Sequence, residues 1–261
     1  MALYTKRAWN LFDPASTAPF NVSRSKVDLF FECPRCFYMD RRLGVSRPSM
    51  PAFSLNNAVD ELMKKEFDIH RAKKTAHPLM KAYGIDAVPL QHESMEAWRD
   101  ARKRGIRFVH TPTNLEVSGG IDDVWVSPSG ELIIVDYKAT STRKEISLDD
   151  QWKAAYKRQV EVYQWLFRQN GFPVSKTAYF VFCNGDADKN AFDGKLEFAV
   201  SIIPYVGNDA WIEGTLQGIR ECLTSTALPE PGSTCEHCSY RAAARAFEVE
   251  RPSEPRQRTL Y

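Results

Sequence analysis

Apolar residues recur along this chain with two different periods, and these periods predict where helices and strands lie. Apolar positions three or four residues apart predict amphipathic helices at residues 25–43, 55–67, 147–171 and 211–223. Short runs of β-branched and aromatic residues predict strands at residues 124–126, 132–135, 176–183 and 195–203. Residues 1 to about 22 are expected to be irregular, and 71–95 to form a connector or helical insertion interrupted by proline. The pattern predicts an α/β fold with a central mixed β-sheet flanked by helices.

The best-defined strand pair surrounds residues 127–130, Ser-Pro-Ser-Gly, which have the composition of a tight turn. The apolar runs on either side therefore predict a β-hairpin. Because side chains alternate between the faces of a strand, Asp136 and Lys138 project from one face and Tyr137 from the other. Asp122 precedes the partner strand at its open end, where the hairpin register can bring it to Asp136.

Two carboxylates and a lysine at one end of a hairpin suggest metal-dependent hydrolysis of a phosphodiester. Carboxylate oxygens are hard ligands that suit Mg²⁺ or Mn²⁺ better than a soft metal, and Lys138 can hold or help to deprotonate an attacking water. The neighbouring Asp123 lies on the opposite strand face and ranks second as a metal ligand. The alternative is a surface hairpin whose Asp136 and Lys138 simply pair.

Six cysteines form a second signal. Four of them make two Cys-x-x-Cys pairs about two hundred residues apart, at Cys33, Cys36, Cys235 and Cys238. Two such pairs can supply four thiolates to one tetrahedral zinc or to an iron-sulfur cluster. A redox dithiol needs only one pair, a disulfide framework suits a secreted chain, and free buried thiols are the remaining alternative. Cys183 and Cys222 are expected to be structural.

Three motifs together resemble the PD-(D/E)XK nuclease superfamily, in its RecB-like branch. They are Gly-x-Ile-Asp at 119–122, Asp-Tyr-Lys at 136–138, and Gln-x-x-x-Tyr at 159–163 on the predicted helix after the hairpin. The resemblance implies a restriction-endonuclease-like core. It also implies that Asp122, Asp136 and the carbonyl of Tyr137 hold the catalytic metal, that Lys138 serves the nucleophile, and that Gln159 and Tyr163 position nucleic acid.

The same family places an acidic residue or a histidine on an earlier helix, which here corresponds to residues 55–67. On a helical wheel Asp60 lies at the edge of the apolar stripe, Glu66 lies within it, and Glu61 faces the far side. Asp60 is therefore the predicted metal ligand, with Glu66 in reserve. Family members with a cysteine-bound cluster tend to carry a histidine about where Asp60 falls, so this sequence departs from that version.

The cysteines add to the resemblance. CRISPR-associated RecB-like exonucleases and AddB-type helicase-nuclease subunits carry one early and three late cysteines around a 4Fe-4S cluster. Cys33, Cys235 and Cys238 resemble three of these, whereas Ala244 stands where the last would be expected and Cys36 is additional. Since the total stays four, the expected cofactor is a 4Fe-4S cluster or Zn²⁺, acting as a structural staple between the N- and C-terminal segments.

Length and charge limit the remaining choices. The 261 residues, 43% of them hydrophobic, suit one nuclease-like domain over residues 1–247 that includes the cysteine site, followed by a disordered tail at 248–261. A net charge of +2 excludes a uniformly basic coat for nucleic acid, although basic residues cluster locally. The clusters are Lys64-Lys65, Arg71 with Lys73-Lys74, Arg99–Arg107, Arg143-Lys144, and Lys153 with Lys157-Arg158. Without a signal peptide or membrane span in the sequence, the expected location is cytoplasmic, away from membranes.

The resulting hypothesis is a Mg²⁺- or Mn²⁺-dependent DNA nuclease. The resemblance implies an exonuclease of DNA repair, recombination or CRISPR adaptation, which acts on single-stranded or end-containing duplex DNA with a helicase or CRISPR adaptation proteins as partners. The alternative is a non-catalytic DNA-binding subunit that uses the nuclease-like fold as a platform. A zinc-ribbon interaction protein would explain the cysteines but would leave the Asp-x-Lys and Gln-x-x-x-Tyr motifs without a role.

Overall fold

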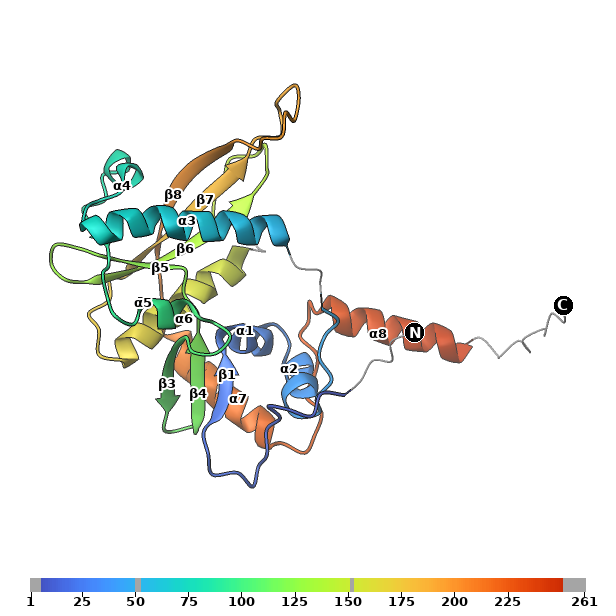
Figure 1. Cartoon of the computed structure of the whole chain (residues 1–261). Helices are drawn as coiled ribbons and strands as arrows, with labels where there is room; N and C mark the ends of the chain where they lie inside the picture. The colour runs from blue at the N-terminus through green and yellow to red at the C-terminus, as the bar shows by residue number, and fades with distance from the viewer. Residues whose placement is uncertain (1–5, 50–52, 151–152, 251–261) are drawn as a thin grey trace. The chain divides into compact units, whose positions relative to one another are not determined.

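The computed structural model describes residues 6–49, 53–150 and 153–250 (Figure 1). Contacts divide the chain into two compact units, and each is described by itself. The sheet unit comprises the described residues within 17–28 and 50–218, and the cysteine unit those within 1–16, 29–49 and 219–261. The helices are α1 (Arg24–Glu32), α2 (Pro34–Arg41), α3 (Ser54–Lys73), α4 (Pro78–Ala82), α5 (Met95–Arg99), α6 (Ala154–Gln169), α7 (Trp211–Thr224) and α8 (Glu236–Glu250). The strands are β1 (Phe20–Ser23), β2 (Val88–Pro89), β3 (Ile106–His110), β4 (Leu115–Gly119), β5 (Asp123–Val126), β6 (Leu132–Thr140), β7 (Thr177–Gly185) and β8 (Phe198–Val206).

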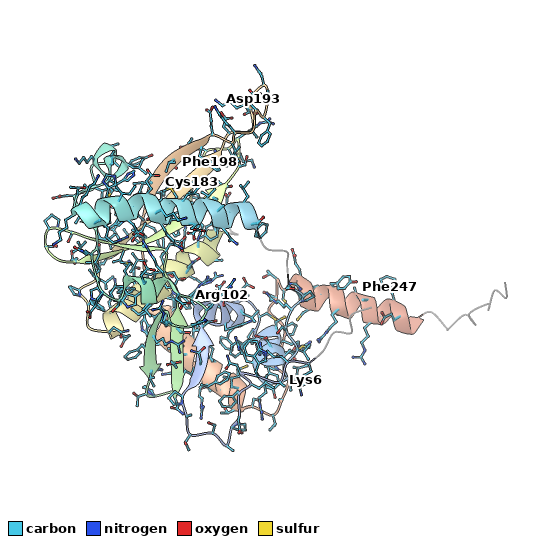
Figure 2. All side chains as sticks on the ribbon, viewed as in Figure 1. Lys6, Arg102, Cys183, Asp193, Phe198 and Phe247 are labelled. Carbon is cyan, nitrogen blue, oxygen red and sulfur yellow. The ribbon has the colours of Figure 1, made fainter. Side chains whose placement is uncertain are left out.

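The larger sheet has the strand order β2-β5-β6-β7-β8, and it confirms the predicted mixed sheet. β6 and β7 run parallel, whereas the other neighbours are antiparallel. The predicted hairpin is present as β5 and β6, in a register that pairs Asp123 with Val135 and Val126 with Leu132. Its turn requires glycine at Gly130, whose φ of 84° lies in the left-handed region. β7 and β8 are the two further predicted strands, and Asp193 lies at the tip of the loop that joins them (Figure 2).

Helix α3 crosses one face of this sheet (Figure 1) and closes the main hydrophobic core. Its buried residues Met63 and Phe67 are four positions apart and therefore lie on one face of the helix. The Phe67 ring stacks on Trp125 of β5 at a centroid distance of 5.5 Å. Cys183 belongs to the same core, and Phe198 packs against it from β8 (Figure 2). Helix α6 contacts β6, and its Tyr156 ring lies 6.4 Å from Phe180 of β7. Helices therefore flank the sheet, as predicted.

A smaller sheet of strand order β1-β4-β3 was not predicted from the sequence. Its first strand, β1, pairs in parallel with β4 so that Phe20 lies opposite Leu115. The pairing joins residues 95 positions apart by their numbering, and the four residues of β1 are too short for a clear local pattern. The expectation of irregular structure up to residue 22 is therefore wrong at Phe20–Val22.

Three predicted helices have different limits in the structure. The helix expected at 147–171 is α6, which begins at Ala154, so the expected start at 147–150 is wrong; residues 151–152 lie outside the described residues. The expected helix over residues 25–43 is divided at Cys33, because Pro34 begins α2 and has no N–H group to continue the bonding of α1. The helix expected at 55–67 is α3, whose last residue is Lys73. The next residue, Lys74, caps the helix in the left-handed conformation with φ 53°. The first residues of the expected connector at 71–95 are thus helical.

The C-terminal helix α8 ends at Glu250, so the first three residues of the expected tail belong to a helix. The rest of that tail, residues 251–261, lies outside the described residues. The single domain over 1–247 and the disordered tail stay predictions. No helix within the described part of the chain is both long and apolar enough to cross a membrane.

Candidate active site and cysteine centre

The β5–β6 hairpin places the first two carboxylates beside each other. Asp122 directly precedes β5, and its Oδ2 atom accepts a hydrogen bond from the backbone N–H of Tyr137 on β6, at 3.0 Å. That bond holds Asp122 at the level of Asp136, the residue before Tyr137. The Asp136 side chain is 0% exposed and lies close enough to Asp122 for the charge of Asp122 to raise its pKa. The local pairing of the hairpin therefore creates the predicted pair.

Lys138 lies on the same strand face as Asp136, as the alternation of β6 predicts. Its Nζ atom forms an ion pair with Asp136 Oδ2, and it donates a hydrogen bond to Gln159 Oε1 of α6 at 3.4 Å. The ammonium also lies 4.7 Å from the centre of the Tyr156 ring. Among the described residues, neither oxygen of Asp136 accepts a hydrogen bond from any group other than this ammonium. A buried carboxylate with no donor other than this ammonium fits a metal ligand.

Helix α3 contributes Asp60, the predicted third carboxylate, together with Lys64, which was predicted as part of a basic cluster but not as a site residue. Lys64 lies one turn after Asp60, and its Nζ is 2.6 Å from Asp60 Oδ2 and 3.1 Å from Asp122 Oδ1. The reserve ligand Glu66 instead pairs with His77 at 2.8 Å. The four-residue spacing of Asp60 and Lys64 was a usable signal for their pairing, but the approach of Lys64 to Asp122 depends on tertiary packing.

These groups surround a pocket of about 540 Å³. Of the predicted site residues, Asp60, Asp122, Tyr137, Lys138 and Gln159 line it. The wall also includes two groups that the sequence analysis did not identify as site residues, which are the Arg24 side chain of α1 and the Tyr156 ring of α6. The pocket thus combines carboxylates, cations and an aromatic ring, a mixture that suits a phosphate, its counter-ion and a nucleotide base.

Asp136 itself does not line the pocket, and its pKa shifts in the opposite direction from that of Asp122, which does. Burial raises the pKa of Asp136 to about 7, and the charge of Asp122 acts in the same direction against the opposing effect of Lys138. Burial would also raise the pKa of Asp122, but Lys64 and Lys138 outweigh it and lower that pKa. For Asp60, burial and the charge of Asp122 raise the pKa. A divalent cation would relieve the repulsion among these groups, and carboxylate oxygens are the ligands that Mg²⁺ and Mn²⁺ prefer, so the residues fit such an ion.

The Gln159–Tyr163 pair lies beside Lys138, but its two members differ in exposure. Gln159 lines the pocket and donates from Nε2 to the Tyr163 hydroxyl at 3.3 Å. Tyr163 is only 3% exposed, and Arg24 hydrogen bonds to it. A Cβ atom on Gly119 would come within 2.7 Å of the Tyr163 ring, so the glycine of the Gly-x-Ile-Asp motif makes room for this tyrosine. Tyr163 can therefore act through Gln159 and Arg24, which it holds in place.

Asp123 lies on the opposite strand face, as predicted, and is bound by cations there. It forms ion pairs with Arg71 and Arg99, and it accepts a hydrogen bond from the Tyr137 hydroxyl at 2.6 Å. Arg99 also donates to the backbone carbonyl of Asp122 at 3.0 Å. This buried network supports the backbone of the metal-ligand candidate Asp122 and leaves Asp123 engaged with arginines.

Several residues of the predicted basic clusters likewise balance acidic partners. Arg71 and Arg99 are almost fully buried in the Asp123 network, so they do not form a phosphate-binding surface. Other members of these clusters pair at the surface or at its edge. These pairs are Lys65 with Glu61, Arg104 with Asp100, Arg107 with Glu116, and Arg158 with Asp28. The cations that line the pocket itself are Arg24 and Lys138, with Lys64 bonded to two of its acids.

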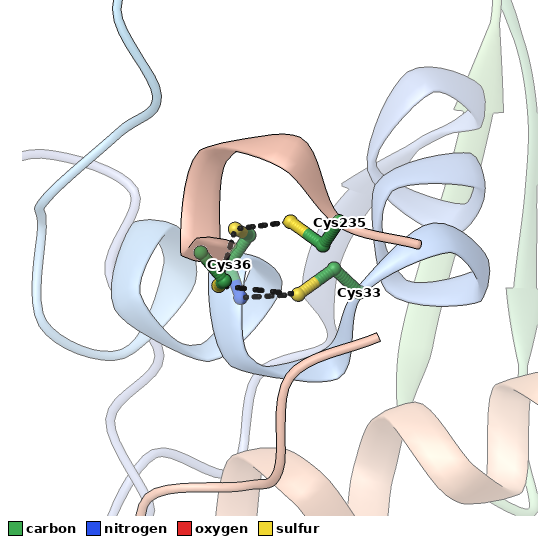
Figure 3. Close-up of side chains that lie close together, drawn as sticks. Cys33, Cys36 and Cys235 are labelled. Atoms are coloured by element: carbon green, nitrogen blue, oxygen red, sulfur yellow. Dashed lines mark hydrogen bonds between the residues drawn. The ribbon is translucent and has the colours of Figure 1, made fainter. Parts of the chain in front are cut away.

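The four predicted cysteines come together in the cysteine unit. Their sulfur atoms all lie within 4.8 Å of one another, and Cys33, Cys36 and Cys235 point toward a common centre (Figure 3). Cys33 caps the start of α2, and Cys235 immediately precedes α8, so each pair occupies the first turn of a helix. The cluster joins N- and C-terminal segments, as predicted, and four soft thiolate ligands suit a metal ion.

The other two cysteines lie elsewhere. Cys183 is buried in the hydrophobic core of the larger sheet, where burial raises the pKa of its thiol to about 11. The Cys222 thiol lies near the Pro34 carbonyl, at 4.0 Å, and burial raises its pKa to about 11 as well. Both are therefore protonated thiols outside the group of four, in agreement with the expected structural role.

Comparison with known proteins places the chain in a family. The family model described as "PD-(D/E)XK nuclease superfamily" matches residues 21–243. The chain belongs to this superfamily. No curated protein matches it. A solved structure described as "Crystal structure of SSO0001" is similar over 90% of this chain and 87% of that one, with 13% sequence identity and a TM-score of 0.39.

Membership of the PD-(D/E)XK superfamily gives the pocket a general chemistry. The superfamily generally hydrolyses phosphodiester bonds with divalent metal ions, so nucleic acid is the substrate class that it implies, although some members are inactive. The matched range contains both the hairpin site and the four cysteines. The motif residues of this PD-(D/E)XK protein could be identified from the sequence, whereas the places of Arg24, Lys64 and Tyr156 at the site could not. No periodic or motif signal marks Arg24.

Proposed function

We propose that this PD-(D/E)XK protein is a Mg²⁺- or Mn²⁺-dependent DNA nuclease of the RecB-like branch, with Asp122, Asp136 and Lys138 as its catalytic residues. The observation that carries the proposal is the full burial of the Asp136 carboxylate, whose only donor among the described residues is the Lys138 ammonium. Burying a carboxylate in this way costs free energy that a purely structural surface hairpin would avoid. The alternative, a surface hairpin whose Asp136 and Lys138 simply pair, does not fit this burial.

The residues of the pocket would divide the work between metal binding and proton handling. Asp122 and Asp136, with Asp60 and the Tyr137 carbonyl, would hold one or two ions. When bound, such an ion acidifies water and offsets the charge that develops on the phosphate. Lys138 would orient the attacking water, since its ammonium is fixed between Asp136 and Gln159. Arg24, at the pocket wall, would hold a non-bridging phosphate oxygen.

Gln159 and Tyr163 would position the nucleic acid, with Gln159 in the pocket and Tyr163 behind it. The four cysteines would bind a structural metal, either a 4Fe-4S cluster or Zn²⁺. The finer parts of the proposal rest on the resemblance and the sequence pattern alone. They are an exonuclease role in DNA repair, recombination or CRISPR adaptation, and single-stranded or end-containing duplex DNA as the substrate. They also include a helicase or CRISPR adaptation proteins as partners, and a cytoplasmic location.

One observation favours the second candidate, a non-catalytic DNA-binding platform. The Lys64 ammonium bridges Asp60 and Asp122 in the position that a bound cation would occupy between these acids. A platform could keep this internal ion pair permanently and would need no metal. An enzyme must displace the ammonium or bind its metal beside it.

The experiment that separates the two candidates measures cleavage and binding of the same DNA. Labelled single-stranded and duplex DNA are incubated with the full chain in Mg²⁺, in Mn²⁺ and in a chelator, and binding is measured in parallel by fluorescence anisotropy. The proposal expects cleavage with either metal and none with the chelator. Binding without cleavage in every metal would overturn the nuclease and support the platform.

A further inference from the structure

The spacing of the four cysteine sulfurs identifies the kind of metal centre that they can form. The Sγ atoms of Cys36 and Cys235 are 3.6 Å apart, those of Cys36 and Cys238 are 3.6 Å apart, and those of Cys33 and Cys238 are 3.8 Å apart. Each of these short distances joins one Cys-x-x-Cys pair to the other. The two pairs therefore converge on one point and do not form two separate centres.

A single tetrahedral ion requires this spacing. Four sulfurs at about 2.3 Å from one zinc lie about 3.8 Å from one another, which agrees with the three distances above. In a 4Fe-4S cube each cysteine binds its own iron, so two sulfurs are separated by an iron–iron edge in addition to the metal–sulfur bonds. A cube, or a two-iron centre with one iron for each pair, would hold the sulfurs of opposite pairs much farther apart. The cluster that the resemblance implies does not fit.

We propose that Cys33, Cys36, Cys235 and Cys238 bind one Zn²⁺ ion in a closed tetrahedral site, and that this protein contains no iron-sulfur cluster. Zinc is preferred to a single ferrous ion because thiolate sites of this geometry bind zinc more tightly. Four protein ligands leave no open position, which makes the site structural. Zinc at this site takes no part in hydrolysis, so its binding is independent of the proposed nuclease activity.

The surroundings of the sulfurs support a centre that carries negative charge. Four thiolates around one Zn²⁺ carry a net charge of −2, and N–H groups point at them. The backbone N–H groups of Gly232 and Cys36 donate to Cys33 Sγ at 3.2 and 3.4 Å, and Arg47 Nη2 donates to Cys235 Sγ at 3.4 Å. A Cβ atom on Gly232 would come within 2.0 Å of the Glu32 carbonyl, so glycine permits the approach of this N–H. Neutral, apolar thiols would not need an arginine beside them.

The geometry also separates this group from the cysteines that do not belong to it. Cys222 lies near the Pro34 carbonyl, and Cys183 is in the core of the sheet unit. Ala244, which stands where the resemblance expects a cysteine, has no ligand atom. Cys36 supplies the fourth sulfur instead. Moving a ligand from the late segment to the early one gives two equivalent pairs, which is the arrangement of structural zinc sites with two Cys-x-x-Cys motifs.

Metal analysis of the full chain tests the proposal without using nuclease activity. The protein is produced in medium that contains both iron and zinc, purified anaerobically, and analysed for zinc, iron and acid-labile sulfide. The expected result is one tightly bound zinc per chain, no sulfide and no visible absorption. Iron with sulfide, a single iron in place of zinc, or no bound metal in fully reduced protein would each overturn it.

Three variants assign the zinc to the cysteines. Cys36→Ser should lose the zinc or bind it at least about tenfold more weakly, whereas Cys222→Ser, the matched control, should keep it. Asp136→Asn should also keep it, which separates this zinc from any ion at the carboxylates. Retention of zinc by Cys36→Ser would overturn the assignment.

If Cys36→Ser does not fold, the native protein provides the same test. Cobalt exchanged into it should give the visible spectrum of a tetrahedral tetrathiolate site, and a thiol-reactive mercurial should release the metal. An octahedral cobalt spectrum, or release that does not follow modification of the thiols, would contradict the proposal. A protein that holds this zinc but cleaves no DNA would refute the proposed function alone.

Discussion

Asp136 is a residue whose burial costs stability and whose carboxylate the proposed metal site requires. Its carboxylate is fully buried, and its main contact is the ammonium of Lys138. Burial raises its pKa to about 7, with the charge of Asp122 acting in the same direction. Below about pH 7 the folded protein without metal therefore favours the protonated acid, whereas metal binding needs the carboxylate.

This pKa predicts how pH affects the stability of the metal-free protein. The pKa of Asp136 is raised above its unfolded value of 3.8, so between those two values the folded state binds more protons than the unfolded state. The contribution of Asp136 to the free energy of unfolding therefore falls as the pH rises toward about 7. In a chelator, the free energy of unfolding of the wild type relative to Asp136→Asn should decrease from pH 5 to pH 8. Denaturant titrations check this, and a difference that does not change with pH would contradict it.

The Lys64 ammonium is expected to compete with a metal ion for Asp60 and Asp122. The ammonium contacts Asp60 and Asp122, so Lys64→Met should strengthen Mn²⁺ binding severalfold and lower the melting temperature in a chelator, where the acids repel each other. Lys65→Met is the matched control, because Lys65 is exposed and pairs with Glu61, away from Asp60 and Asp122. Calorimetric titration measures the affinity. Equal affinities in wild type and Lys64→Met would show that the ammonium does not compete.

At the residue scale, the sequence predicted what local geometry determines. Alternation along β6 was enough to put Asp136 and Lys138 on one face, and the turn was enough to bring Asp122 to them. Arg24 and Lys64 were missed because their roles depend on how α1 and α3 pack against other elements. Glu66, the reserve metal ligand, has a suitable position on the helical wheel but pairs with His77, a partner that the wheel does not show.

At the element scale, the β5–β6 hairpin and α6 were predictable because each is defined by residues close in sequence. The smaller sheet was not, since β1 is short and pairs with a strand far along the chain. The division between α1 and α2 could have been found from Pro34, which cannot continue the hydrogen bonds of a helix. It also puts Cys33 at a helix start, where its thiol can accept the Cys36 N–H.

Gly119 of β4 is expected to be required for the close packing of this strand against Tyr163 of α6. A Cβ atom at Gly119 would lie 2.7 Å from the Tyr163 ring, so Gly119→Ala should displace the tyrosine and cost about 1–3 kcal/mol of stability. Because Tyr163 holds Gln159, cleavage should fall with it. Gly214→Ala is the control. Gly214 lies within α7 with open space at its Cβ position, and alanine there should stabilise the protein by about 0.5–1 kcal/mol. Unchanged stability and cleavage in Gly119→Ala would contradict the close packing.

At the scale of the whole molecule, the cysteine centre joins segments about two hundred residues apart in sequence. The sequence predicted this joining from the two Cys-x-x-Cys pairs alone, because four thiolates of one site must meet wherever they lie in the chain. It could not predict the type of metal, since zinc and a 4Fe-4S cluster both accept four thiolates. The distances between the sulfurs supply that distinction.

Removal of the cysteine-bound metal should affect more than the two Cys-x-x-Cys pairs. Because the site closes a long loop, we expect faster hydrogen exchange throughout the segments 29–49 and 219–250 of the metal-free protein. Mass spectrometry of exchange in metal-loaded and metal-free protein measures this. Faster exchange limited to the residues next to the four cysteines would indicate an independent zinc ribbon and would contradict the staple.

The most direct test of the proposed nuclease site is the cleavage rate of end-labelled DNA by the wild type and by Lys138→Ala, with Lys65→Ala as the control, in Mg²⁺ or Mn²⁺. We expect Lys138→Ala to bind DNA normally but to cleave it at least about a hundredfold more slowly, because it has lost the group that orients the attacking water. Lys65→Ala should cleave at the wild-type rate. Equal cleavage by wild type and Lys138→Ala would show that the β5–β6 hairpin is not the active site.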